Sequence, residues 1–199
     1  MRYIVFDTGP IISLTMNNLL WILEPLKKRF CGEFCITKSV KNELIDKPLR
    51  TKKFKFEALQ TLHYINKGVL KVIDNSQIAG LSHELMELAN KCFKAHGNWI
   101  KITHKAEIDS LAATISLNAS SFIVDERTVR LLIENPQRLL EIIEGKLHTS
   151  ITTNEESLRK FQRDVRGVRL LRSVELVIAA YELGLLDNCL LYTSPSPRD

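Results

Sequence analysis

Cysteine is scarce in this chain, with four in 199 residues. Cys31 and Cys35 do not have the spacing of a zinc knuckle. No cluster of cysteines and histidines lies near these two residues, near Cys92 or near Cys189. The pattern argues against a disulfide framework or a structural zinc site. It favours buried thiols in a reducing compartment, so we expect a cytoplasmic protein.

Long apolar runs, internal repeats and nucleophilic triads are also missing. No apolar run reaches the length that spans a bilayer, and Arg2–Phe6 has the pattern of a strand rather than of a signal peptide. No serine or cysteine is arranged convincingly with a histidine for nucleophilic catalysis. His104 precedes an acidic helix, which is typical of a helix-start or surface histidine. The sequence therefore favours neither a membrane protein nor a triad hydrolase.

The overall composition is that of a globular domain. Hydrophobic residues make up 45% and charged residues 26% of the chain. The formal net charge is +5 and the sequence pI is about 9.0. A moderately basic chain binds a polyanion more readily, but many proteins without a nucleic-acid role carry as much charge. Composition alone therefore does not show whether the chain binds nucleic acid.

The opening stretch, Arg2–Pro10, organises the rest of the chain. Four apolar or aromatic residues run without alternation from Tyr3 and end on Asp7, which fits a central strand buried on both faces. Thr8, Gly9 and Pro10 then stop the strand and start a helix. Asp7 should therefore stand at the carboxyl end of a central parallel strand, where ligands bind in open α/β sheets. A carboxylate there either caps the next helix or holds a positive group.

Apolar strand patterns alternate with helical patterns along the chain. Further strands are predicted at Glu33–Thr37, Val69–Asp74, Ser121–Asp125 and Val168–Arg172. Helices are predicted between them, including Lys38–Asp46 before Pro48, Phe54–Lys67, Ser76–His96, His104–Asn118 and Val174–Leu186. The alternation predicts a three-layer α/β/α fold with a central parallel sheet of about five strands.

A charged helical insertion is predicted before the last strand, at about 128–166. Arg127–Glu134, Pro136–Lys146 and Glu155–Val165 have the patterns of three short helices. They carry many basic residues, among them Arg159, Lys160 and Arg163. The insertion is either a solvated element or one that grips a substrate by its phosphates.

Four carboxylates have positions that suit a common site. Asp7 and Asp125 each end an apolar strand, and they open onto one edge of the sheet if the strands are neighbours. Glu43 lies about a turn and a half into the helix after the second strand. Asp109 lies early in the helix before the Asp125 strand, whereas Glu107 points elsewhere on that helix. Each acid alone is equally consistent with a solvated residue at a helix start.

Taken in order, the four acids and their surroundings resemble the PIN-domain nucleases. The resemblance covers Met1 to about Asp187, which we expect to form a single domain, with the insertion as a departure. The motifs that carry it are Phe6–Leu14, Val40–Leu44, Ala106–Ala113 and Ile123–Arg127, followed by the closing Val168–Leu186. None of them is distinctive alone, but the ordered set is moderately specific.

The resemblance implies a function and a set of site residues. Asp7, Glu43, Asp109 and Asp125 match the acidic quartet that holds Mg²⁺ or Mn²⁺ for hydrolysis of RNA phosphodiester bonds. Both Glu107 and Asp109 fit the third position, and the spacing back from Asp125 favours Asp109. Thr8, Glu107 and Arg127 would support the site. Apart from the resemblance, the charge of the insertion leads us to expect that Arg159, Lys160 and Arg163 bind the substrate.

Several roles are consistent with this resemblance. The chain would be a metal-dependent endoribonuclease, either a VapC-type toxin paired with an antitoxin or a nuclease of RNA processing that works with a ribonucleoprotein, and relatives are often homodimers. The alternative is a PIN fold without catalysis that serves as a scaffold for RNA or protein. A plain doubly wound domain without a site would require the four ordered motifs to be a coincidence.

The last residues, 188–199, do not continue the pattern. Composition changes abruptly after Asp187, and Ser194–Pro197 cannot continue a helix. Cys189–Asp199 is similar, residue for residue, to the translation of a transposase adapter used to build sequencing libraries. We expect this segment to be a processing scar or a disordered tail, outside the domain at 1–187.

Overall fold

The computed structural model describes residues 1–51, 53–74, 76 and 78–186, so the expectation for residues 188–199 lies outside the described part. The elements of the first half are β1 Tyr3–Phe6, α1 Thr8–Met16, η1 Leu20–Ile22, α2 Leu23–Phe30, β2 Glu33–Thr37, α3 Lys38–Lys41, η2 Asn42–Asp46, α4 Lys47–Arg50, α5 Lys55–Asn66 and β3 Leu70–Ile73. Those of the second half are α6 Ala79–Asn90, β4 Phe93–Ala95, β5 Asn98–Trp99, α7 Lys105–Ser116, β6 Ser121–Ile123, α8 Arg127–Glu134, α9 Pro136–Leu147, β7 Thr152–Thr153, α10 Glu155–Asp164, β8 Leu170–Leu171 and α11 Ser173–Glu182.

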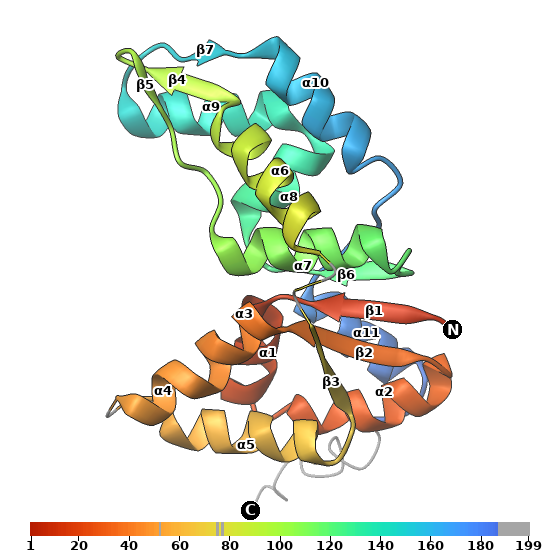
Figure 1. Ribbon diagram of the computed structural model, residues 1–199. Coiled ribbons are helices and arrows are strands. Elements are labelled where there is room, and N and C mark those ends of the chain that lie inside the picture. The colour runs from red at the N-terminus through yellow and green to blue at the C-terminus, as the bar shows by residue number, and fades with distance from the viewer. Residues whose placement is uncertain (52, 75, 77, 187–199) are drawn as a thin grey trace, which may run out of the picture.

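The main sheet is parallel and five-stranded, as predicted, and its strand order is β3-β2-β1-β6-β8. β1 lies in the middle, where both of its edges are hydrogen-bonded and both faces are covered (Figure 1). This position explains why its sequence is continuously apolar rather than alternating. In the register with β6, Phe6 is level with Ile123.

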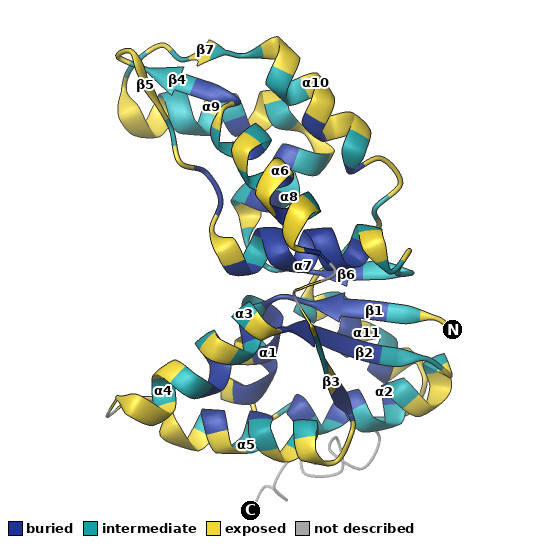
Figure 2. Cartoon of the chain, in the orientation of Figure 1, coloured by how far each residue is buried: buried dark blue, intermediate teal, exposed yellow. Residues whose placement is uncertain are grey.

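Two hydrophobic cores lie on opposite faces of this sheet. Ile4, Phe6 and Ile123 belong to a core formed with α1, α2, α3, η2 and α11. Val5 and Phe122 belong to a core formed with α6, α7, α8, α9 and α10. Successive strand residues therefore face opposite helix layers. Figure 2 shows β1 and α7 as mostly buried, and the resulting three-layer α/β/α architecture is the predicted one.

The second half of the chain adds a distal lobe, which we define as α6, β4, β5, α8, α9, β7 and α10. Its strands form a separate three-stranded antiparallel sheet in the order β5-β4-β7. The lobe extends from α7 away from the main sheet (Figure 1). It contains the helical insertion expected before the last strand, and the three helices of that insertion lie close to their predicted bounds.

One predicted helix in this lobe is wrong in its length. Ser76–His96 was expected to be a single helix, but α6 ends at Asn90 and β4 follows it. The Asn90 side-chain oxygen accepts hydrogen bonds from the backbone N–H groups of Ile102, at 2.8 Å, and Thr103, at 3.2 Å. This contact holds the segment after β5 against the end of α6, and no local pattern in the sequence reveals it.

The helix after β2 also differs from the prediction, because Pro48 does not end it. The chain stays helical from α3 through η2 to α4, with Pro48 in the first turn of α4. η2 is a π-helix, whose wider turn relieves the clash between a proline ring and the preceding carbonyl groups. The helix therefore passes through the proline, and Glu43 lies on the widened turn.

The three cysteines in the described part differ in exposure. Cys35 and Cys92 are buried, and burial raises the pKa of the Cys92 thiol to about 12, whereas Cys31 is exposed. No helix in the described ranges combines the length and the hydropathy needed to cross a membrane.

Candidate active site

Asp7 is the most unusual carboxylate in the described structure. It follows β1 at the N-cap position of α1, and only 3% of its surface is exposed. Its Oδ1 atom has no hydrogen-bond partner among the described residues. Burial raises the pKa of Asp7 to about 7; the Thr8 backbone amide partly offsets this, and Glu107 and Glu43 raise it further by like-charge repulsion. The Asp7 carboxylate is therefore shielded from water, repelled by nearby acids and left with one oxygen that accepts no hydrogen bond from the described residues.

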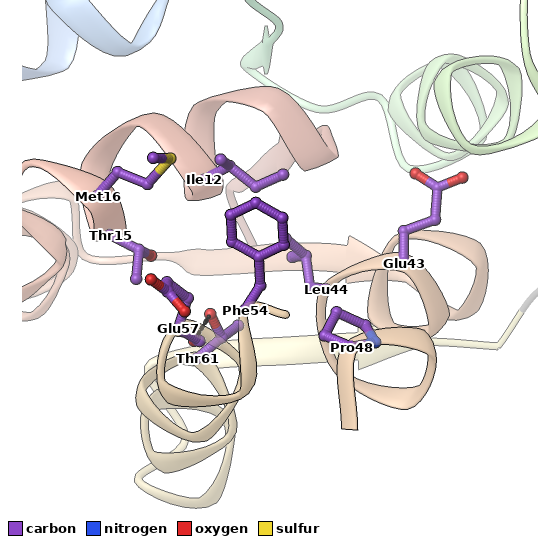
Figure 3. Close-up of a pocket in the computed structure, with 9 residues that line it drawn as sticks. All are labelled: Ile12, Thr15, Met16, Glu43, Leu44, Pro48, Phe54, Glu57 and Thr61. Atoms are coloured by element: carbon purple, nitrogen blue, oxygen red, sulfur yellow. Dashed lines mark hydrogen bonds between the residues drawn. The ribbon is translucent and has the colours of Figure 1, made fainter. Parts of the chain in front are cut away.

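Glu43 comes to this edge from η2. The Thr8 hydroxyl donates a hydrogen bond of 2.9 Å to Glu43 Oε2, which joins the start of α1 to the π-helix. Lys47 Nζ lies 3.7 Å from Glu43 Oε1 on the exposed side. Figure 3 shows Glu43 at the end of a pocket whose other walls include Leu44 and Phe54. Glu43 and the Thr8 hydroxyl both lie at the edge of the sheet next to Asp7, the location expected from the sequence.

Glu107 approaches the same carboxylates from the first turn of α7. Its Oε2 atom accepts a hydrogen bond of 2.8 Å from the His104 backbone N–H, which fixes the side chain at the helix start. Burial raises the pKa of Glu107 to about 7, the hydrogen bond from His104 lowers it, and Glu126 and Glu43 raise it again. Glu107 therefore interacts with the other acids at short enough range to change its own protonation.

Glu126 is the acid that the sequence analysis missed. It caps α8, and its two carboxylate oxygens accept hydrogen bonds of 2.9 Å from the Val129 backbone N–H and from the Thr128 hydroxyl. No local signal marks Glu126 as a site acid, because it directly follows the strand-end Asp125 and glutamate is not a preferred N-cap residue. We name Asp7, Glu43, Glu107 and Glu126 the acidic site.

Asp109 is held elsewhere on α7, on the side that meets α3 and α6. It is 1% exposed and accepts short hydrogen bonds from the hydroxyls of Ser39 and Ser82. Lys105 Nζ lies 3.6 Å from its Oδ1 atom. Asp109 therefore connects α7 with α3 and α6. Glu107, two residues away on the same helix, points in a different direction and contributes to the raised pKa of Asp7.

Asp125 reaches the predicted edge but its side chain lies on the other face. Since Phe6 is level with Ile123, Asp125 is one residue beyond the position level with Asp7. Its Oδ2 atom accepts from the Ser13 hydroxyl at 2.9 Å, and its Oδ1 atom accepts from the Ser173 backbone N–H at 2.8 Å. Asp125 therefore connects α1 with α11, although it remains close to the start of α1: a Cβ placed on Gly9 would lie 3.5 Å from Asp125 Cβ.

The basic residues predicted to help are spread over two regions. Arg127 is exposed at the start of α8, next to Glu126. The predicted substrate-binding residues lie on α10, which packs on α6 in the distal lobe (Figure 1). Each of the three contacts an acid of the same helix: Arg159 with Glu155 at 3.9 Å, Lys160 with Glu156 at 2.6 Å and Arg163 with Asp164 at 3.1 Å.

The fit of a divalent cation depends on the carboxylates themselves. Within the described ranges, no three His, Cys, Asp or Glu side chains are close enough to form a ready-made metal group. The buried Oδ1 atom of Asp7 nevertheless lacks a partner, and the adjacent acids raise its pKa. Carboxylate oxygens are the ligands that Mg²⁺ and Mn²⁺ prefer, and a cation would relieve both the missing contact and the repulsion. The donor chemistry of the acidic site fits such an ion.

Comparisons with known proteins add little to this picture. No family model matches the chain, and no curated protein matches it. Among solved structures, it is similar to a chain in the crystal structure of VapBC2 from Rickettsia felis bound to a DNA fragment from the promoter. The TM-score is 0.44 at 16% identity, and the alignment covers 86% of this chain and 98% of that one. At this level the similarity carries no argument about function.

Proposed function

We propose that this protein is a divalent-metal-dependent endoribonuclease of the PIN-domain type. The observation that carries the proposal is Asp7, a buried carboxylate with one unpartnered oxygen at the carboxyl edge of a central parallel strand. This is the edge where ligands bind in open α/β sheets. Glu43 and Glu107 raise its pKa, so a cation at this point would be stabilised by several carboxylates.

The residues of the acidic site have distinct parts in this proposal. Asp7, with Glu43 and Glu107 nearby, would hold the cation, while the Thr8 hydroxyl and the His104 backbone N–H keep the two glutamates in place. A bound Mg²⁺ or Mn²⁺ would activate water and offset the negative charge of a phosphodiester. Asp109 and Asp125, which complete the quartet implied by the resemblance, position α3, α6, α1 and α11 around the site through their hydrogen bonds.

RNA is the proposed substrate because the ordered motifs resemble those of ribonucleases, and the net charge of +5 would favour a polyanion. The same resemblance includes antitoxin-paired toxins and RNA-processing nucleases. A small antitoxin-like reading frame beside the gene would favour the toxin, and co-purification of its product with this chain would establish the pair.

Cleavage of RNA by the purified protein tests the proposal. We expect cleavage with Mn²⁺ or Mg²⁺, none after chelation, and at least about 1,000-fold slower cleavage with Asp7→Asn. Asp74→Asn is the matched control, because Asp74 also follows a strand of the main sheet but is exposed and pairs with Lys38 at 2.9 Å. RNA binding without cleavage under all metal conditions would contradict the proposal and favour the scaffold alternative.

A second measurement does not depend on activity. Mn²⁺ should raise the melting temperature of the wild-type protein and of Asp74→Asn, because an ion that binds only the folded state stabilises it. The shift should be lost in Asp7→Asn. An equal shift in all three proteins would show that the ion binds elsewhere.

A further inference from the structure

A cavity of about 380 Å³ opens beside the acidic site, on the side of the distal lobe. Glu107 and Glu126 are among its lining residues, so it borders the acidic site directly. The other walls come from the segment that leads into α7, from the start of α8 and from α9. Three separate parts of the chain thus enclose one space next to the proposed chemistry.

The walls of this cavity are divided between apolar and polar groups. Ile100, Ile102 and Ile143 supply branched apolar surface from two different segments. Lys101 and Thr128 supply polar groups in the same space. Ligand pockets begin at about 300 Å³, so this cavity, whose lining is about as polar as it is apolar, suits a small ligand that has both an apolar and a polar part.

The charged groups of the cavity have different roles. Lys101 is exposed, and no ion pair or hydrogen bond of its side chain is found among the described residues. Its ammonium group is therefore available to an anionic ligand. Glu126 is an oriented acceptor, because the Val129 backbone N–H and the Thr128 hydroxyl fix its carboxylate. A phosphate at Lys101 and a hydroxyl or amino group at Glu126 would both be satisfied.

We propose that this cavity is a subsite for one nucleotide, adjacent to the phosphodiester that the acidic site cleaves. Its base would lie against the isoleucines, its phosphate would contact Lys101, and its sugar or base donors would face Glu126. The inference rests on the proposed function for the identity of the ligand. It names the residues that would give the enzyme a preference for an RNA sequence, because contacts to bases determine sequence specificity and contacts to phosphates position the chain.

Direct binding of nucleoside 5′-monophosphates tests the subsite without any cleavage. The probes are AMP, GMP, CMP and UMP, with the 2′-deoxy forms beside them, titrated into the full chain and followed by NMR. We expect saturable binding that one base strengthens, and about 10-fold weaker binding in Lys101→Ala from loss of a charge-assisted hydrogen bond. Lys146→Ala, an exposed lysine of α9 outside the cavity, should bind like wild type.

A second variant fills the cavity instead of removing its charge. Ile143→Trp should abolish mononucleotide binding, and Leu147→Trp on the exposed side of the same helix should not. If Ile143→Trp fails to fold, the comparison between Lys101→Ala and Lys146→Ala decides alone. Absence of binding by the wild-type chain, or equal binding by Lys101→Ala, would overturn the subsite.

Cleavage kinetics separate this inference from the proposed function. Lys101→Ala should raise KM for RNA about 10-fold with kcat nearly unchanged. It should also lower the salt dependence of binding by about one unit of slope. Mononucleotide binding by a protein that never cleaves RNA would support the subsite and contradict the proposed nuclease function. Cleavage of RNA with the same KM in Lys101→Ala as in wild type would support the nuclease function and contradict the subsite.

Discussion

Two neighbouring strands of the main sheet, β1 and β6, both lead from an apolar run to an aspartate, yet the two side chains meet different surroundings. Asp7 is buried with an unpartnered oxygen, and burial, with smaller contributions from Glu107 and Glu43, raises its pKa. Asp125 uses both oxygens in hydrogen bonds that join α1 to α11. The difference follows from one residue of register, which turns the two carboxylates to opposite faces. An apolar strand that ends on aspartate therefore indicates the edge of a site, but not which acid serves it.

The largest expected effect is on RNA cleavage by the variants Asp7→Asn and Asp125→Asn. Asp7→Asn should lower kcat about 1,000-fold or more, since metal-assisted charge stabilisation supplies several kcal/mol of the barrier reduction. Asp125→Asn should lower kcat about 10-fold, in the range found when a group that orients a metal ligand is lost. Single-turnover rates with matched RNA would measure both. Equal losses would mean that the two strand ends share one role.

The two acids of α7 provide the next comparison. Glu107→Gln should lower kcat about 100-fold, because it removes a charge that faces Asp7. Asp109→Asn should mainly destabilise the fold, by about 1–3 kcal/mol, because it disturbs hydrogen bonds that Ser39 and Ser82 donate. Urea unfolding and kcat measured on the same samples separate these effects. A larger kcat loss in well-folded Asp109→Asn would restore the preference that spacing gives to Asp109.

The pH dependence of stability should also differ between the strand ends. Burial raises the pKa of Asp7 from 3.8 to about 7, so the folded state holds a proton that the unfolded state has lost. Stability should therefore fall as the pH rises from about 4 to about 7. Without metal, Asp7→Asn should be more stable than wild type at pH 8 by on the order of 2 kcal/mol, and the difference should vanish near pH 4.

The control for this prediction is Asp125→Asn, which should be less stable than wild type at pH 8, by about 1 kcal/mol, because it weakens two hydrogen bonds. Denaturant melts at several pH values would provide the measurement. A gain in stability for Asp125→Asn, or none for Asp7→Asn, would contradict the conclusion that burial and repulsion destabilise the charged form of Asp7.

The smallest expected effect concerns the basic face of α10. Replacing Arg159, Lys160 and Arg163 together by alanine should change the salt slope of RNA binding by less than one unit, because each already contacts an acid on its own helix. Filter binding at several salt concentrations measures the slope. A drop of two or more units would show that α10 contacts phosphates and that the distal lobe grips the substrate.

The sequence predicts much of this molecule because long apolar runs and helical stripes are local signals. All strands of the main sheet and the three insertion helices were predicted near their bounds. The strands β5 and β7 were not, because segments of two residues such as Thr152–Thr153 show no periodicity and form only through pairing with β4. The helix was wrongly predicted to end before Pro48, because the π-helix that accommodates this proline has no signal in the sequence.

The edge of the sheet on which Asp7 lies follows from the sequence, and the function of the acids there remains a prediction. The positions of Asp7 and Glu43 follow from strand ends and helix spacing, which are local. The face of Asp125 depends on the register between β1 and β6, and the choice between Glu107 and Asp109 depends on how α7 is rotated against the sheet. Both are set by packing between distant segments, so single-sequence patterns do not contain them.

The π-helix η2 has a consequence for insertions and deletions. Deleting one residue from Asn42–Asp46 would convert the wide turn to an ordinary α-helical turn and change the directions of the side chains within it. Either the Thr8–Glu43 hydrogen bond or the burial of Leu44 would then be lost. An extra residue at the β4–β5 turn, where Gly97 has open space around it, should be tolerated. A library of single-residue deletions and insertions, scored for folded yield, should show its deepest trough at residues 42–46.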